Sequence, residues 1–277
     1  MPAFRKGGLF NGCLLLSDID GTLVHEGRIP ERNLAAIDFF VKQGGLFSIA
    51  TGRSVEATRL YVTQSGANAG VVTCNGAVIY DYAAERPIYS RTLPEEVKPL
   101  VKELVQEFPA VGAEAHHLRE LYLLNRTDAV RAHMEYEQIS PLPLSEAEIY
   151  ERPWTKVLFA TFDREEMERL HTRCRPYNCG DYYFLETADI YYELTCGGVN
   201  KGEALSRLAA HYRIPRSKSF AIGDYFNDVE MLAAAGISAA PSGAPEEIKS
   251  RVDFTAGRCE EGCVADFIDY LKQKLQD

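Results

Sequence analysis

The sequence predicts an α/β protein in which a parallel-sheet core is interrupted by an inserted α+β domain. Short apolar runs alternate with amphipathic helical segments up to about residue 75, and the same alternation returns after about residue 200. The stretch between them is richer in aromatic and acidic residues. Strands joined by helices pair in parallel through right-handed crossovers, so the two alternating parts are expected to form one core. We therefore expect residues 1–84 and 194–277 to form the core and residues 85–193 to form the insert.

The first half of the core is expected to begin with a buried strand at residues 13–17. A helix over residues 30–43 has proline at its start and Gly44-Gly45 as its stop. The next expected elements are a strand at 46–50, a helix from Thr51 to Gln64 and a strand at 70–74. Asn75-Gly76 is typical of a tight turn, so residues 77–81 are expected to return as a hairpin.

The insert and the second half of the core follow the same kind of signal. In the insert we expect helices at 94–108, 127–139 and 164–175 and strands at 121–125, 156–162 and 190–194, with a break at Pro141-Leu142-Pro143. In the second half we expect helices at 201–212, 227–235 and 263–275 and strands at 219–222, 237–240 and 252–255.

Composition limits the classes of partner. The chain has 277 residues, and its formal net charge of -10 argues against nucleic acid or an anionic membrane as partner. The apolar run Leu14–Leu16 is too short for a signal peptide or a membrane span. Seven cysteines, an odd number, favour free thiols in a reducing, cytoplasmic location. The spacings of Cys174 with Cys179 and of Cys259 with Cys263 do not favour a zinc site.

Two acids follow the first strand directly. Asp18 and Asp20 occupy alternate positions at the strand exit, and burial of an unpaired carboxylate costs several kcal/mol. Taken alone, Asp20-Gly21-Thr22 is typical of a turn with a helix cap. The later clusters favour a functional interpretation instead.

Three further polar clusters stand at strand exits or helix starts. They are Thr51-Gly52-Arg53, Lys201, and Gly223-Asp224 with Asn227-Asp228. The exits of parallel strands converge on one crevice, so these clusters are expected to meet Asp18 and Asp20 there. Crowded carboxylates are typical of a Mg²⁺ site, while a threonine, a lysine and a helix start favour an anion. Together they favour phosphoryl transfer.

Four of these segments resemble, in order, the four motifs of the haloacid-dehalogenase-like (HAD) superfamily. They are Asp18-Ile19-Asp20-Gly21-Thr22-Leu23, Ala50-Thr51-Gly52-Arg53, Val199-Asn200-Lys201-Gly202 and Gly223-Asp224-Tyr225-Phe226-Asn227-Asp228. Cys74-Asn75-Gly76-Ala77 and the position of the insert resemble the Cof-like phosphatase branch. The resemblance spans nearly the whole chain. It implies a Rossmann-like catalytic core with a large α/β (C2-type) cap that closes over the cleft and selects the substrate.

The resemblance also implies roles for residues. Asp18 would be the nucleophile that becomes an aspartyl-phosphate, and Asp20 would be the general acid and base. Mg²⁺ would be held by Asp18, Asp20 (through its backbone) and Asp224. The expected phosphate and substrate contacts are Thr51, Gly52, Arg53, Lys201 and Asn227, and Asp228 would orient its neighbours. One departure is Pro241-Ser242-Gly243-Ala244, where the family commonly has Met followed by Gly-Asn-Ala.

Each residue also has an ordinary structural alternative. Lys201 could be a solvated residue at a helix start, Arg53 could pair with a surface acid, and Asp224–Asp228 could be a helix cap with a polar first turn. In the insert, His116-His117, Tyr182-Tyr183 and Tyr191-Tyr192-Glu193 are candidates for substrate contact, although such pairs more often serve packing.

The sequence therefore predicts a Mg²⁺-dependent phosphatase that hydrolyses small phosphorylated metabolites, sugar phosphates first among them. The alternatives are a phosphomutase that uses the same aspartyl-phosphate and a phosphosugar-binding sensor without turnover. The expected protein is a monomer or weak homo-oligomer without nucleic-acid or membrane partners.

Overall fold

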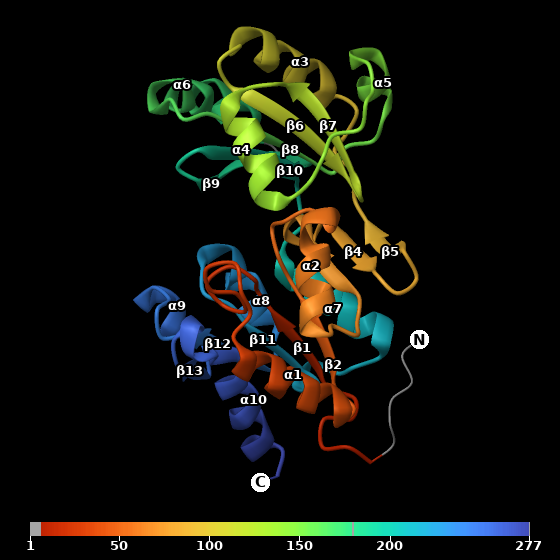
Figure 1. Cartoon of the computed structure of the whole chain (residues 1–277), viewed down its shortest axis with the longest axis vertical. Helices are drawn as coiled ribbons and strands as arrows, with labels where there is room; N and C mark the ends of the chain where they lie inside the picture. The colour runs from red at the N-terminus through yellow and green to blue at the C-terminus, as the bar shows by residue number, and fades with distance from the viewer. Residues whose placement is uncertain (1–6, 179, 277) are drawn as a thin grey trace. The chain divides into compact units, whose positions relative to one another are not determined.

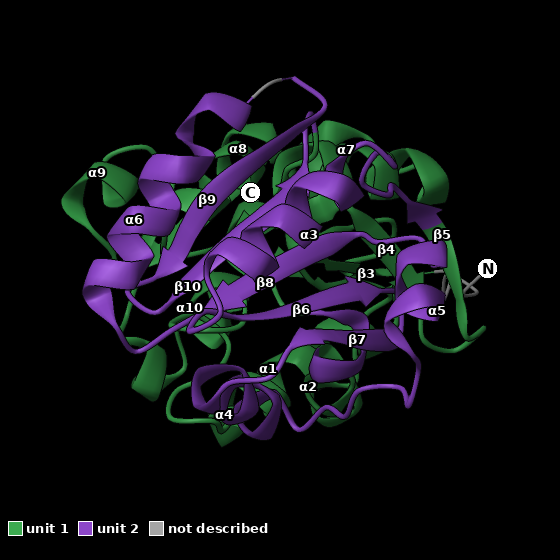
Figure 2. Cartoon of the chain, turned by 90° about the horizontal axis from the view of Figure 1, so that it is seen from above, with its two compact units in different colours: residues 1–53, 58–88, 199–277 green, residues 54–57, 89–198 purple. Residues whose placement is uncertain are grey.

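The computed structural model describes residues 7–178 and 180–276 and divides into two compact units (Figures 1 and 2). Unit 1 holds the chain up to Arg53, Thr58–Ile88 and the chain from Val199 onward. Unit 2 holds Ser54–Ala57 and Tyr89–Gly198. In the described residues, no helix combines the length and apolar character needed to cross a bilayer.

Unit 1 is built on a five-stranded parallel sheet. Its strands, in spatial order, are β13 (Phe254–Ala256), β12 (Ile237–Pro241), β11 (Ser219–Ile222), β1 (Leu14–Ser17) and β2 (Leu46–Ile49). The register places Ser17 beside Ile222 on one side and beside Ile49 on the other. The central strands β1, β2 and β11 are buried throughout, so they are short apolar runs rather than alternating ones. Their exits therefore lie side by side.

Helices complete unit 1. They are α1 (Glu31–Lys42), α2 (Val55–Ser65, its first turn assigned to unit 2), α7 (Lys201–Tyr212), α8 (Val229–Ala234), α9 (Glu246–Lys249) and α10 (Cys263–Lys274). Short 3₁₀ turns are η1 (Cys74–Gly76), η3 (Arg216–Lys218), η4 (Phe226–Asp228) and η5 (Cys259–Glu261). α1 packs against α10, and α7 packs against α8 (Figure 1). Phe10, Phe40, Phe47 and Phe267 fill the core beneath α1 and α10.

The segment after α2 differs in part from expectation. β3 (Val71–Thr73), β4 (Val78–Asp81) and β5 (Arg86–Ser90) form a separate small sheet, and β3 meets the end of β2 through the parallel bridge Ala50–Val72. Where a two-residue hairpin turn was expected, the structure has the 3₁₀ turn η1, with positive φ at Cys74, Asn75 and Gly76. A Cβ on Gly76 would lie 2.3 Å from the backbone oxygen of Asn200, so only glycine fits beneath the start of α7.

Unit 2 has an antiparallel five-stranded sheet in the order β7 (Glu120–Asn125), β6 (Gly112–His117), β8 (Lys156–Ala160), β10 (Tyr191–Cys196) and β9 (Tyr182–Ala188). Its helices are α3 (Val97–Glu107), α4 (Asp128–Glu137), α5 (Glu146–Glu151) and α6 (Arg164–Cys174), followed by η2 (Arg175–Tyr177). α4 packs through Val130 and Met134 on the face that carries Leu158 and Ala160. The fold class, an α/β core with an α+β insert, is thereby confirmed.

The sequence prediction missed the strands β5, β6 and β9 and the short helices α5 and α9. β6 carries Glu114 and His116, which are buried, so its apolar pattern is broken. α5 has six residues, too few for a clear period, although a Ser145–Glu148 capping box starts it. The chain passes from unit 1 to unit 2 at Ile88/Tyr89 and returns at Gly198/Val199, within β5 and just after β10, and the sequence analysis placed the ends of the insert at 84/85 and 193/194.

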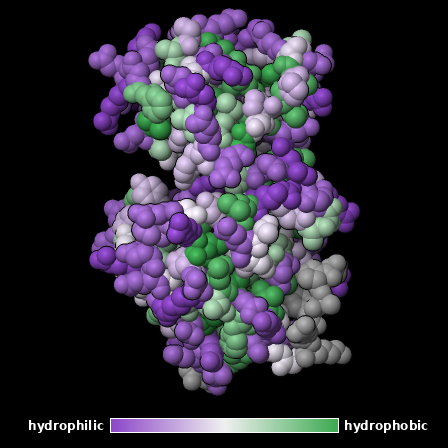
Figure 3. Space-filling model, viewed as in Figure 1, coloured by the Kyte–Doolittle hydropathy of each residue, from purple (hydrophilic) through white to green (hydrophobic). Residues whose placement is uncertain are grey.

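The face shown in Figure 3 is largely hydrophilic, with apolar side chains in scattered groups. The loop after β11 nevertheless exposes two large apolar side chains: Tyr225 is 57% and Phe226 is 49% accessible. Their rings contact each other edge to face at 5.1 Å. Both belong to the loop after β11, which also carries three of the expected site residues.

Candidate active site

A buried lysine lies between two carboxylates at the exits of β1 and β11. Lys201 Nζ donates to Asp18 Oδ1 and to Asp228 Oδ1, each at 2.6 Å, and Lys201 is fully buried. α7 begins at this lysine because the side chain of Asn200 caps the helix by accepting from the Glu203 N–H. The alternative of a solvated lysine at a helix start is therefore wrong.

The charges in this cluster perturb one another. Burial alone would lower the pKa of Lys201, but Asp18 and Asp228 raise it, so the ammonium stays charged. Burial raises the pKa of Asp18 well above its usual value against the attraction of Lys201, and Asp228 and Asp224 raise it further. Asp18 is thus a carboxylate whose ionisation depends on nearby positive charge.

The loop after β11 supplies the other two acids. Asp228 is fully buried, and its Oδ2 accepts from the backbone N–H groups of Asp224 and Tyr225 at 3.0 and 3.2 Å. Gly223 is required at this bend because a Cβ there would lie 2.5 Å from Asp228 Cγ. Asp228 therefore holds both the loop and the ammonium group of Lys201.

Asp224 is oriented by Thr22, a residue for which the sequence analysis assigned no separate role. The Thr22 hydroxyl donates to Asp224 Oδ1 at 2.7 Å. Burial raises the pKa of Asp224 to about 6, the Thr22 hydrogen bond opposes this shift and Asp228 adds to it. Gly21, at φ 86°, leaves room for the carboxylate, since a Cβ there would lie 2.5 Å from Asp224 Oδ2.

Asp18, Asp224 and Asp228 together fit a hard divalent cation. One oxygen from each lies within 4.8 Å of the others, and one lysine pairs with two of them, Asp18 and Asp228. The three carboxylates outnumber the one lysine ammonium, and all of the ligand atoms that they offer are oxygens, which suits Mg²⁺. The expected ligands were the side chains of Asp18 and Asp224 and the backbone of Asp20. Asp228, expected only to orient its neighbours, is the third side chain of this group, and the Asp20 side chain is held by Arg53.

The Asp20 side chain is held by Arg53. Arg53 Nε and Nη2 donate to the two Asp20 oxygens at 2.9 and 2.8 Å in a fork geometry. The Asp20 side chain is 53% exposed and that of Arg53 is 8% exposed, and the guanidinium lies over the Tyr61 ring at 5.4 Å. Arg53 thus pairs with an acid, which was the ordinary structural alternative for this residue. The acid is Asp20, the residue expected to transfer protons.

The remaining expected residues line the exits of β2 and β3. Thr51 is buried and its hydroxyl accepts from the Arg53 N–H at 3.1 Å. Gly52 faces the side chain of Asn75, at 3.2 Å from where a Cβ would stand, and Asn227 Nδ2 donates to Asn75 Oδ1 at 3.3 Å. The expected helix start at Thr51 is wrong, because α2 begins at Val55 and Gly52 lies in the preceding loop.

Asn75 is a second residue with no expected site role. The sequence assigned it to a turn, yet it links Gly52 with Asn227 across the strand exits. The sequence did contain a signal for this role, because the Asn75-Gly76 pair follows a strand exit at the same edge of the sheet as the other clusters.

Four of the candidate contact residues of the insert, the two histidines and the pair Tyr191-Tyr192, make contacts within unit 2. His116 lies 2.9 Å and His133 lies 2.6 Å from the buried Glu114, and His117 lies 3.1 Å from Thr155. Tyr192 stacks with Phe184, and Tyr191 contacts His133 edge to face.

The sequence matches the haloacid dehalogenase-like hydrolase family over residues 15–268. The chain is a haloacid dehalogenase-like hydrolase. This match confirms the expected family and the expectation that the protein is an enzyme. The four segments that resemble the family's motifs lie at the strand exits and at the helix start described above.

Relatives of this hydrolase carry phosphatase names. It is 28% identical over 267 residues to the HMP-PP phosphatase of Yersinia pseudotuberculosis, covering 91% of this chain and 93% of that protein. Among solved structures, a haloacid dehalogenase-like hydrolase from Bacteroides thetaiotaomicron is similar with a TM-score of 0.86 and 22% identity, covering 94% of this chain and 99% of that one. A HAD subclass IIB sugar phosphatase has a TM-score of 0.77 and 22% identity, covering 94% and 98%. The two structures support the fold.

Proposed function

We propose that this hydrolase is a Mg²⁺-dependent phosphatase that acts on small phosphorylated metabolites through Asp18. The buried Lys201 between Asp18 and Asp228, with Asp224 beside them, is the observation that supports this most directly. A purely structural cluster would have no use for a third carboxylate beside an ammonium that already has two carboxylate partners, because each added buried charge costs free energy.

In this proposal Asp18, Asp224 and Asp228 hold Mg²⁺, together with the backbone of Asp20 that the family resemblance implies. The bound ion neutralises negative charge on the acids and on a phosphate oxygen. Lys201 is fixed between two acids, so its charge is in place before substrate arrives, and it offsets charge on the transferring phosphoryl group.

The proposed reaction has two steps. A carboxylate oxygen of Asp18 forms a bond to phosphorus, the ester P–O bond breaks and the leaving alkoxide takes a proton from Asp20. Water then attacks the aspartyl-phosphate, Asp20 accepts a proton from that water, and phosphate leaves with Asp18 regenerated. Asp20 must leave the Arg53 fork to do this, and an incoming phosphate competes with it for the guanidinium.

We propose sugar phosphates as the first substrate class, since one similar structure is named a sugar phosphatase and the relatives act, by name, on HMP-PP. Unit 2, which carries most of the insert, would be the cap that selects among them. We also propose a monomeric or weakly homo-oligomeric enzyme in the cytoplasm, which fits the six described cysteines being free.

A screen of phosphorylated metabolites for phosphate release tests the proposal. Wild type is assayed with Mg²⁺ and with a chelator, beside Asp18→Asn and, as a matched control, the surface variant Asp38→Asn on α1. We expect release by wild type and Asp38→Asn with Mg²⁺ only, and none by Asp18→Asn. Turnover by Asp18→Asn would exclude Asp18 as nucleophile, and isomerised sugar phosphate without free phosphate would indicate a mutase.

A further inference from the structure

Two buried thiols lie directly behind the turn that carries the acids. Cys259 Sγ donates to the backbone oxygens of Thr22 and Val24 at 3.2 and 3.4 Å, and Cys263 Sγ donates to the same Thr22 oxygen at 3.1 Å. Cys259 is 7% and Cys263 is 0% exposed. Both thiols donate to the same carbonyl oxygen, so their sulfur atoms are neighbours.

Thr22 connects this pair to the acids. Its carbonyl accepts from the two thiols and, among the residues that the structure describes, from no other donor. Its hydroxyl donates to Asp224 Oδ1 at 2.7 Å. Thr22 itself is fully buried, so water cannot replace a lost donor without local movement.

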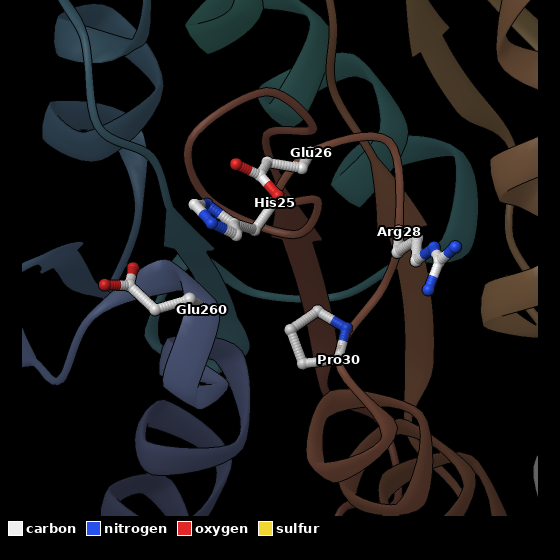
Figure 4. Close-up of a pocket in the computed structure, with 5 residues that line it drawn as sticks. All are labelled: His25, Glu26, Arg28, Pro30 and Glu260. Atoms are coloured by element: carbon white, nitrogen blue, oxygen red, sulfur yellow. The ribbon is translucent and has the colours of Figure 1, made fainter.

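A surface pocket is lined by chain neighbours of Cys259 and of its acceptor Val24. The pocket has a volume of about 460 Å³ and is lined by His25, Glu26, Arg28, Pro30 and Glu260 (Figure 4). Glu260 follows Cys259 in the chain, and His25 follows Val24, which accepts from the Cys259 thiol. The neighbouring Cys263 holds the pKa of Cys259 below its usual value against burial, which favours the reactive thiolate at Cys259, the more exposed of the two cysteines.

We propose that Cys259 and Cys263 are an oxidation-sensitive dithiol and that their disulfide weakens Mg²⁺ binding at Asp18, Asp224 and Asp228. The second half of this inference rests on the proposed function. The oxidant is hydrogen peroxide: Cys259 attacks one peroxide oxygen, the O–O bond breaks, and a sulfenic acid and water result. Cys263 then attacks the Cys259 sulfur and expels a second water, so two S–H bonds are replaced by one S–S bond.

The disulfide leaves the Thr22 carbonyl without a donor. Neither sulfur retains a hydrogen, so the turn must shift to find another partner, and the hydroxyl that orients Asp224 shifts with it. Loss of a hydrogen-bond partner behind a metal ligand typically costs about 10–100-fold in metal affinity.

The test uses the full chain treated with hydrogen peroxide. Trypsin cleaves after Arg258 and Lys272, so one peptide, 259–272, holds both cysteines and no other. We expect this peptide to lose two hydrogen atoms and to resist alkylation. Titration calorimetry with Mg²⁺ alone should show a Kd raised about tenfold, and dithiothreitol should reverse both changes.

Two variants separate this pair from the other thiols. Cys259→Ser keeps a hydroxyl donor but cannot form the disulfide, so its Mg²⁺ affinity should survive peroxide. Cys174→Ser removes a buried thiol of unit 2 and should respond as wild type does.

Three results would overturn the inference: a 259–272 peptide alkylated twice after peroxide, a disulfide with unchanged Mg²⁺ affinity, or equal loss of affinity in Cys259→Ser. Failure of the proposed function is seen separately, as absence of phosphate release by the reduced protein.

Discussion

Replacement of Asp224 by asparagine should make the metal-free protein more stable while it abolishes activity. Asparagine keeps the volume and still accepts from the Thr22 hydroxyl, but it removes one charge from the acid cluster. Burial, opposed by Thr22 and reinforced by Asp228, raises the pKa of Asp224 from 3.8 to about 6. That shift of about two units means that the ionised carboxylate destabilises the metal-free fold by about 3 kcal/mol at neutral pH.

The pH dependence follows from the direction of this shift. A carboxyl group whose pKa is raised on folding stabilises the fold fully below its unfolded value, and that stability is lost as pH rises through about 6. Wild type with chelator should therefore lose stability between about pH 4 and 7 through this group, and Asp224→Asn should not. Bound Mg²⁺ should restore wild type and leave the variant nearly unchanged.

Urea unfolding at pH 7.5 and at pH 4, with chelator and with Mg²⁺, measures these differences. Asp38→Asn, an exposed acid paired with Lys42 on α1, is the control and should shift stability by less than about 0.5 kcal/mol. A metal-free Asp224→Asn that is less stable than wild type at pH 7.5, or a difference that does not change with pH, would refute the reasoning.

Three further substitutions probe the other contacts. Lys201→Met should remove phosphate release and lower the metal-free unfolding free energy by about 3–5 kcal/mol, because it leaves two buried carboxylates without their cation; unchanged urea stability would contradict this. Thr22→Val should raise the Mg²⁺ Kd by about tenfold in calorimetry, and unaltered affinity would show that the hydroxyl does not orient Asp224. Arg53→Lys should lower kcat/KM by roughly tenfold with little change in Tm, since lysine cannot make the two-pronged contact to Asp20; equal kcat/KM values would argue against a role for that fork.

Much of the core could be predicted from the sequence because its signals are local. The apolar runs of β1, β2 and β11 and the periods of α1, α7 and α10 are properties of a few consecutive residues, and the structure has each of them close to its expected bounds. β6 escaped because its buried Glu114 is matched by histidines from β6 and from α4, a pairing that no local pattern shows. The family motifs were readable for the same reason as the strands, since each occupies one strand exit or helix start.

By itself the sequence determined which acids, threonine and lysine are available and that parallel strands would bring their exits together. Only the tertiary structure decided how they pair. Asp228 lies with Asp18 and Asp224, Arg53 holds the Asp20 side chain, and the Thr22 hydroxyl and Asn75 complete the contacts. The physical reason is distance: these pairings depend on where α7 begins and how the β11 loop bends, and hydrogen bonds between residues far apart in the chain form or fail within a few tenths of an ångström.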